Sequence, residues 1–183
     1  MTDKSNIILP HGGYKNLMSY QNAVIVHDLT VMFCDKYIDR FSRTKDQMIQ
    51  AARSGKQNIV EGSMAAGISR ETEIKLVGVA RASQEELLAD YHDFLRQHQL
   101  LLWGKDDERV IKARKLTYMS NRTYITYESY MADSESAANV MVCLIHQTNY
   151  LLDQLLRALE RDFIKGGGLR ERLYNARKNY RGY

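Results

Sequence analysis

Apolar positions recur at intervals of three and four residues along most of the chain, which is the spacing of one face of an α-helix. In the first such segment, about 14–41, the positions at these intervals are Leu17, Tyr20, Val24, His27, Val31, Cys34, Ile38 and Phe41. Their rhythm is that of a seam between packed helices. The pattern therefore predicts a long first helix over 14–41 with one buried face.

Capping residues mark where the next two helices begin. Thr44 followed by Gln47 is a capping-box pattern and opens a second helix predicted over 44–66. Ser69 is the expected N-cap of a third helix over 70–98, whose first turn carries acidic residues that suit the positive end of the helix dipole. The turns between these helices are short, so consecutive helices are expected to lie antiparallel.

The second half of the chain predicts one further long helix. Asp106 opens a short helix to about Leu116. Four tyrosines and several β-branched residues in 117–132 leave strand, helix and loop all open, and we expect an irregular crossover. Asp133 or Ser134 then starts the last helix, predicted over 134–165 and ending at a triplet of glycines.

These elements predict an all-α protein. The expected fold is an antiparallel, up-and-down four-helix bundle over 14–165, with an insert at 104–132 that includes the irregular crossover before the last helix. Residues 166–183 follow as a basic C-terminal suffix.

Small residues form a stripe on the predicted second and third helices. Gly55 and Gly62 belong to the stripe on the second, and Gly78 and Ala82 to the stripe on the third. A glycine inside a helix costs about 1 kcal/mol relative to alanine, so a compensating interaction is expected. We predict that the two helices approach closely at these four positions.

Polar residues stand beside that stripe. Ser54, Asn58 and Glu61 share one face of the second helix, and Ser83 and Glu86 share one face of the third. Buried polar groups must form hydrogen bonds, so we expect a structural network of these five residues, joined by Arg53 or Arg81. A weaker alternative is a small-molecule or metal site among Ser54, Asn58, Glu61 and Glu86.

The segment QMIQAARSGKQNIVEG, from Gln47 to Gly62, resembles the signature of the four helix bundle protein family that is encoded in intervening sequences of bacterial large-subunit ribosomal RNA genes. This family is similar to accessory proteins of diversity-generating retroelements. A second motif, Ala80-Arg81-Ala82-Ser83-Gln84-Glu85-Glu86-Leu87, matches as well. The chain differs from the pattern at Gln50, where Arg is usual, and at Gly55, where a branched apolar residue is usual.

The C-terminal third resembles a longer branch of that family, which carries a C-terminal suffix. The matching motifs are Ala138-Asn139, Leu151-Leu152, Leu159-Glu160-x-Asp162-Phe163 and Gly167-Gly168-x-x-Glu171-Arg172. The resemblance implies a helical bundle that assembles as a ring-like homo-oligomer, with a pentamer expected. It implies nucleic-acid association only in the retroelement branch, and no enzymatic activity.

The charge distribution draws attention to the tail. The chain has 26 basic and 22 acidic residues and a net charge of +4, and the whole excess lies in 169–183. Basic residues interleaved with tyrosines suit contacts to phosphates and stacking on bases. The candidates for nucleic-acid binding are Arg170, Arg172, Tyr174, Arg177, Lys178 and Arg181. The same pattern also suits a tail that docks on the bundle and keeps its arginines in water.

Catalytic and metal motifs are not found. No histidine has the Glu three positions before it that a di-iron bundle needs. A zinc quartet of His27, Cys34, Cys143 and His146 conflicts with the apolar stripe that contains the first two. Neither a phosphate-binding glycine loop nor a nucleophile elbow occurs, so we expect no cofactor, no metal and no enzyme.

Compartment and function follow from these observations. The N-terminus has no signal pattern, apolar runs are too short for a bilayer, and the two cysteines lie far apart, so we expect a cytoplasmic protein without a membrane partner. The expected function is that of a non-enzymatic, oligomeric helical-bundle protein that binds RNA, DNA or a nucleoprotein through its tail. The alternative is a protein–protein interaction scaffold with no nucleic-acid role.

Overall fold

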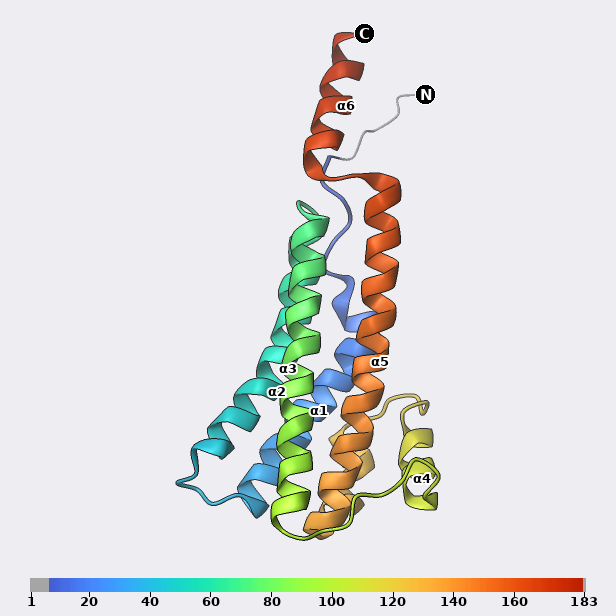
Figure 1. The fold of residues 1–183 in the computed structure, drawn as a ribbon. Coiled ribbons are helices and arrows are strands. Elements are labelled where there is room, and N and C mark those ends of the chain that lie inside the picture. The colour runs from blue at the N-terminus through green and yellow to red at the C-terminus, as the bar shows by residue number, and fades with distance from the viewer. Residues whose placement is uncertain (1–6, 183) are drawn as a thin grey trace.

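The computed structural model describes residues 7–182, and all regular structure within that range is helical (Figure 1). In chain order the elements are η1 (Gly13–Asn16), α1 (Met18–Tyr37), α2 (Arg43–Ala65), α3 (Arg70–Gln97), α4 (Glu108–Leu116), η2 (Tyr124–Ala132), α5 (Ser134–Gly166) and α6 (Leu169–Arg181). Each helix in this part of the chain is too short or too polar to cross a lipid bilayer. Tyr183, the last residue of the predicted suffix, lies outside the described range.

Four long helices, α1, α2, α3 and α5, form the body of the molecule. Helix α3 packs against both α2 and α5, and α1 packs against the same two helices from the other side. Successive members alternate in direction along the long axis of the molecule (Figure 1). Helix α4 and η2 lie against the half of α5 that is farther from α6. The interior consists of two groups of buried apolar residues, and α4 and η2 contribute to the larger group together with the four long helices.

Aromatic rings fill the interior at the end of the body nearest the C-terminus of α1. The ring of Phe33 meets the ring of Tyr91 at 4.9 Å and the ring of Phe94 at 4.8 Å between centroids, both edge to face. The Tyr91 hydroxyl donates to Thr30 Oγ1 at 3.1 Å, so this buried polar atom is satisfied. Burial of each such large side chain contributes about 1.5–3 kcal/mol. A second group of buried residues, among them Ile59, Val77 and Leu152, continues the core toward α6.

The first helix is shorter than the predicted 14–41. Leu17 has an extended backbone (φ −76°, ψ 125°) and separates η1 from α1. Ile38 is also extended (φ −109°, ψ 135°) and ends α1. Phe41, which was predicted to belong to the buried face, is 78% exposed in the turn before α2. The apolar spacing continued past the true end of the helix, so spacing alone overestimated its length.

The buried face of α1 is also rotated from the predicted stripe. Val24, His27 and Val31 are only partly buried, whereas Asn22 and Thr30 are fully buried. Asn22 Oδ1 accepts from Arg122 of the loop before η2, and Thr30 Oγ1 accepts from Tyr91, whereas Asn22 Nδ2 has no partner within residues 7–182. Partnered polar side chains can occupy the interior, and an apolar-periodicity analysis assigns them to the surface.

Side-chain caps define the other helix starts. Ser42 is the N-cap of α2, and its Oγ accepts from the Thr44 backbone N–H at 3.2 Å, so the helix begins slightly earlier than predicted. Ser69 caps α3 through the Thr72 N–H at 3.1 Å, and Asp133 caps α5 through the Ser136 N–H at 2.8 Å. Asp107 rather than Asp106 caps α4.

The crossover 117–132, whose conformation was left open, contains a turn followed by the 3₁₀ segment η2. Tyr127 and Met131 of η2 are buried in the main core. Lys36 Nζ donates to the Met131 carbonyl at 2.9 Å, and the Tyr37 hydroxyl donates to the same oxygen at 2.8 Å. The crossover is thus fixed to the C-terminal end of α1 as well as to α5.

Candidate functional site

The predicted polar network on α2 and α3 is present in reduced form. Ser54 Oγ and Ser83 Oγ lie 2.9 Å apart and form a hydrogen bond between the two helices. Asn58 Nδ2 donates to the Ser54 carbonyl at 2.9 Å and to Ser54 Oγ at 3.1 Å. Three of the five predicted residues therefore form one continuous set of hydrogen bonds.

Glu61 and Glu86 do not join that set. Both carboxylates belong to exposed residues, at the edge of the contact between α2 and α3. A long acidic side chain at such an edge reaches water, which avoids the cost of burying an unpaired charge. Arg81 does not bring them inside either, because it pairs with Glu85 at 2.6 Å and Asp153 at 3.2 Å. The remaining three residues form a neutral link between helices and have no carboxylate with which to bind a metal.

Two of the four predicted small positions lie in the helix contact. A Cβ on Gly62 would stand 3.3 Å from the Glu73 backbone oxygen and 3.4 Å from Leu76 Cβ, so the α2 and α3 backbones approach closely there. Gly55 serves a different purpose, because a Cβ at that position would clash with the amide of Gln84. Gly55 therefore makes room for a side chain rather than for a backbone.

Gly78 and Ala82 were predicted to line the same contact, and the structure contradicts both assignments. A Cβ on Gly78 would have no atom of another helix within 4 Å among the described residues, so Gly78 faces open space. Ala82 is exposed. Helix α3 instead turns Val77, Ala80 and Gln84 inward. Val77 and Ala80 lie one and two positions from Gly78, and Gln84 lies two positions from Ala82. Successive helix residues are about 100° apart, so the buried face of α3 is rotated by roughly 100–200° from the predicted face.

Gln84 is a site residue that the sequence pattern did not single out. It is fully buried, and neither amide atom has a hydrogen-bond partner within residues 7–182. Its position among Ser83, Glu85 and Glu86 suggests a solvent-facing residue. The useful signal was its spacing of three and four from Ala80, Leu87 and Leu88, all of which are buried.

Helix α6 contrasts with this interior because none of its residues is buried. It extends beyond the end of the body, with its axis continuing away from α2 and α3 (Figure 1). The corner before it uses a left-handed Gly167 (φ 67°), and the Gly168 N–H donates to Glu171 Oε2 at 2.7 Å. The N-terminal end of α6 is thus capped by its own acidic residue, so it is not a free anion site.

Arg172 connects α6 to the body. Its guanidinium donates to the carbonyl oxygens of Ile7 at 3.2 Å, Ile68 at 3.1 Å and Gly167 at 3.3 Å. These bonds join the N-terminal segment, the α2–α3 turn and the α5–α6 corner. Arg172 was predicted as a nucleic-acid contact; three of its N–H donors are engaged by the protein itself, so its first role in this structure is to hold the corner in place.

The other predicted tail residues share one face of α6. Arg170, Tyr174, Arg177, Lys178 and Arg181, together with Leu173, line a single shallow hollow along the helix. We call Arg170, Arg177, Lys178 and Arg181 the basic face. Within the described residues, none of these four cations has a carboxylate within 4 Å. Lys165, at the end of α5, lines an adjoining hollow with Arg170 and Tyr174, and the acidic Glu171 lines it as well.

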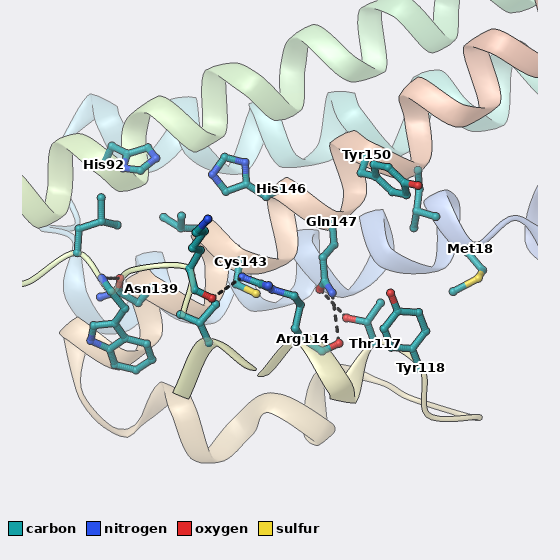
Figure 2. Close-up of a pocket in the computed structure, with 16 residues that line it drawn as sticks. Met18, His92, Arg114, Thr117, Tyr118, Asn139, Cys143, His146, Gln147 and Tyr150 are labelled. Carbon is teal, nitrogen blue, oxygen red and sulfur yellow. Dashed lines mark hydrogen bonds between the residues drawn. The ribbon is translucent and has the colours of Figure 1, made fainter. Parts of the chain in front are cut away.

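A second concave site, which the sequence did not predict, lies between α4 and α5 (Figure 2). It is a cavity of about 570 Å³. Its apolar lining consists of Met18, Leu102, Trp103, Val110, Val142 and Leu151. These six residues come from four separate segments of the chain, and His92 of α3 adds a fifth, so no local motif could indicate the cavity.

The four side chains weighed for zinc are not assembled. Cys34 Sγ lies in the core, 4.0 Å from Met48 Sδ, and burial raises the pKa of its thiol to about 12. His27 lies 3.5 Å from Asp28, whereas Cys143 and His146 line the cavity between α4 and α5. Across residues 7–182 no group of three or more His, Cys, Asp or Glu side chains is arranged to hold a metal ion.

Comparison with known proteins found no match, whether against models of protein families, curated proteins or solved structures. The functional conclusion therefore depends on the geometry and the sequence motifs of this chain.

Proposed function

We propose that the protein is a non-enzymatic four-helix bundle that binds RNA or DNA through the basic face of α6. The observation that supports this most strongly is how little of α6 packs on the body. Four cations and Tyr174 lie on one face of a helix in which no residue is fully buried. Like charges gathered without acidic partners favour an anionic surface as the partner.

The dimensions of α6 suit a nucleic acid. Thirteen residues give a helix about 20 Å long, which fits within the major groove of a duplex or along several nucleotides of a single strand. Tyr174 lies among the arginines and is 68% exposed, so its ring is free to stack on an unpaired base. Single-stranded RNA or a loop would use both the cations and the ring.

The anchoring of Arg172 changes the expected number of phosphate contacts from five to four. Release of counterions from four phosphates predicts a slope of log affinity against log salt of roughly −2.8 for a single strand and −3.6 for a duplex. A fifth contact from Lys165 would steepen either value by less than one. The slope is therefore a direct measure of how many basic residues of this surface engage.

Fluorescence anisotropy with a labelled RNA or DNA tests the proposal. The intact chain should bind with that salt slope, and a chain ending after Gly168 should lose most of the affinity. The quadruple variant Arg170→Gln, Arg177→Gln, Lys178→Gln, Arg181→Gln should behave like the truncated chain. A matched control removes four exposed cations of the body and α4, Arg53→Gln, Lys75→Gln, Lys112→Gln and Arg157→Gln. Equal loss in both quadruple variants, or full binding by the truncated chain, would refute a specific role for α6.

A second candidate function is a protein-interaction scaffold in which α6 mediates homo-oligomer assembly. An apolar stripe of Leu169, Leu173, Ala176 and Tyr180 runs beside the basic face, and Leu173 and Tyr180 are 40% and 93% exposed. A stripe of this kind at helical spacing suits packing on another protomer. The family resemblance favours a ring, with a pentamer expected. Multi-angle light scattering of Leu173→Gln with Tyr180→Gln should then show smaller particles, whereas the basic-face quadruple variant should keep its size.

A further inference from the structure

The cavity between α4 and α5 has a framework of hydrogen bonds that holds α4 at a fixed distance from α5. Thr117 Oγ1 donates to Gln147 Oε1 at 2.6 Å, and Gln147 Nε2 donates to the Arg114 carbonyl at 3.2 Å (Figure 2). At the other end, Asn139 accepts from the Trp103 backbone N–H at 2.8 Å and donates to the Leu101 carbonyl at 2.8 Å. These side chains are satisfied by the protein itself, so they define the shape of the cavity without being needed by a ligand.

The walls between those two anchor points are apolar. Val142 and Cys143 of α5 face Val110 of α4, with Trp103 at one end and Leu151 at the other. Burial raises the pKa of the Cys143 thiol, although Arg114 beside it acts in the opposite direction, so the sulfur stays protonated near neutral pH. Cys143 is thus an apolar wall and not a nucleophile.

The charges at this cavity are all positive. Lys105 and Arg114 line it, and none of its lining residues is an aspartate or a glutamate. Arg114 uses one donor on the Lys105 carbonyl at 3.1 Å and lies beside the Cys143 thiol, and its guanidinium carries further N–H donors. The nearest acidic group in the bonding network, Glu135, is occupied by the Trp103 indole N–H at 3.0 Å and lies 3.8 Å from Arg109.

We propose that this cavity binds a small amphipathic anion, a carboxylate attached to an apolar chain or ring. The carboxylate would lie between Lys105 and Arg114, and the apolar part would lie along Trp103, Val142 and Leu151. The size of about 570 Å³ is within the range of small-molecule sites. The positive rim disfavours the basic helix α6 of a second copy as the occupant, because like charges would be brought together.

The single tryptophan of the chain, Trp103, lines the cavity and provides a local reporter. Helix α4 and helix α6 lie at opposite ends of the molecule (Figure 1), so a ligand on α6 would not quench it. Titration with 11-bromoundecanoate below its micelle concentration should quench Trp103 in a saturable way, since bromine quenches at short range. The uncharged 11-bromoundecan-1-ol should bind about tenfold more weakly, because it lacks the charge-assisted contacts.

Three variants complete the test. Lys105→Met should weaken bromoundecanoate binding by about fivefold to tenfold and leave the alcohol unchanged, while Lys112→Met, an exposed lysine of α4 outside the cavity, should bind as the wild type does. Val142→Phe should fill the space and abolish saturable quenching by both probes, with circular dichroism to verify the fold. If Val142→Phe does not fold, the exposed Lys105→Met variant still carries the test.

Several results would overturn the proposal. These are the absence of saturable quenching in the wild type, equal affinity for the acid and the alcohol, and an equal effect of Lys105→Met and Lys112→Met. Light scattering tests whether a second copy of the chain occupies the cavity instead. An oligomer that dissociates in Val142→Phe would identify the cavity as a contact between copies, and the ligand proposal would fail. None of these outcomes depends on α6, so they leave the nucleic-acid proposal to its own test.

Discussion

Helices α5 and α6 follow one another through a glycine corner, yet they belong to different kinds of structure. Helix α5 buries thirteen of its residues and contacts α1, α3, α4 and η2, whereas α6 buries none. Burial along α5 stops at Leu159, two turns before its end. The change from a packed helix to a solvated one therefore begins inside α5, and the glycine corner comes after it.

The difference indicates that the body provides the folding stability and that α6 is available for binding a partner. Apolar burial is the main source of stability for the helices of the body. A thirteen-residue helix is marginal in water by itself, so α6 depends on the Glu171 cap, the bonds of Arg172 and any partner. An element of low intrinsic stability, with four cations that have no carboxylate partner within residues 7–182, is well suited to bind a partner.

The largest expected effect is in the aromatic core. Phe33→Ala should lower the free energy of unfolding by about 3–5 kcal/mol, because it removes a fully buried ring that packs on Tyr91 and Phe94. Urea denaturation followed by circular dichroism at 222 nm would measure it.

The corresponding experiment on α6 removes the helix in a chain that ends after Gly168. Its unfolding free energy should lie within about 1 kcal/mol of the intact value, because α6 contributes no buried residue. A loss comparable with that of Phe33→Ala would show that α6 is part of the cooperative unit, and the contrast between α5 and α6 would fail.

The ends of the helices were predictable where a capping residue close in sequence determines them. Ser69 was correctly identified as an N-cap, and Asp133 was one of the two residues proposed to start α5, because a cap is a contact between residues two or three positions apart. The end of α1 was not, because apolar spacing continues through Ile38 to Phe41 although the helix stops at Tyr37. At that stop the apolar Ile38 turns to an extended backbone, and no residue type there signals the change.

The candidate sites likewise divide into features that local sequence determines and features that depend on residues distant in sequence. The common face of Arg170, Arg177 and Arg181 follows from helical periodicity alone. The role of Arg172 does not, because its acceptors Ile7 and Ile68 are distant in sequence. The cavity between α4 and α5 was unpredictable for the same reason, and the inward face of α3 was misjudged because buried Gln84 looks like a surface residue.

A pair of glycine substitutions sharpens the comparison inside the body. Gly62→Leu should destabilise by roughly 1–3 kcal/mol, because its Cβ would stand 3.3 Å from the Glu73 backbone oxygen, which a helix cannot readily move. Gly78→Ala should instead stabilise by about 0.5–1 kcal/mol, since the space is open and alanine is the better helix former. Thermal and urea unfolding would measure both. Equal effects of the two substitutions would contradict the assignment of the α2–α3 contact to Gly62.

The bonds of Arg172 should have a smaller and local effect. Arg172→Met removes three donors to backbone carbonyls, so amide hydrogen exchange in α6 should become about fivefold to tenfold faster, while exchange in α5 before Leu159 stays the same. Arg177→Met, on the basic face, is the control and should leave exchange unchanged. Unaltered exchange in Arg172→Met would mean that this arginine is not the connection between α6 and the body.

The smallest effect expected is a pH dependence that belongs to the body alone. Burial, and secondarily the nearby His92, lower the pKa of His146, with Arg81 and Arg114 acting in the same direction and Glu85 against it. The unfolded chain has the ordinary pKa of about 6.5, so as the pH falls it takes up the proton first. Stability is therefore retained above that value and lost progressively as the pH falls toward the lowered pKa of the folded state.

Proton NMR titration of His146 should give a midpoint below the ordinary histidine value, and His92→Gln should move it upward. The loss of stability between pH 7.5 and 5.5 should shrink in His146→Gln, but only slightly, because His146 is an exposed residue and solvent screens its interactions. Helix α6 has no histidine, so the chain ending after Gly168 should keep the same midpoint. A midpoint that shifts on removal of α6 would mean that α6 influences the environment of His146, and the separation of the two regions would be incomplete.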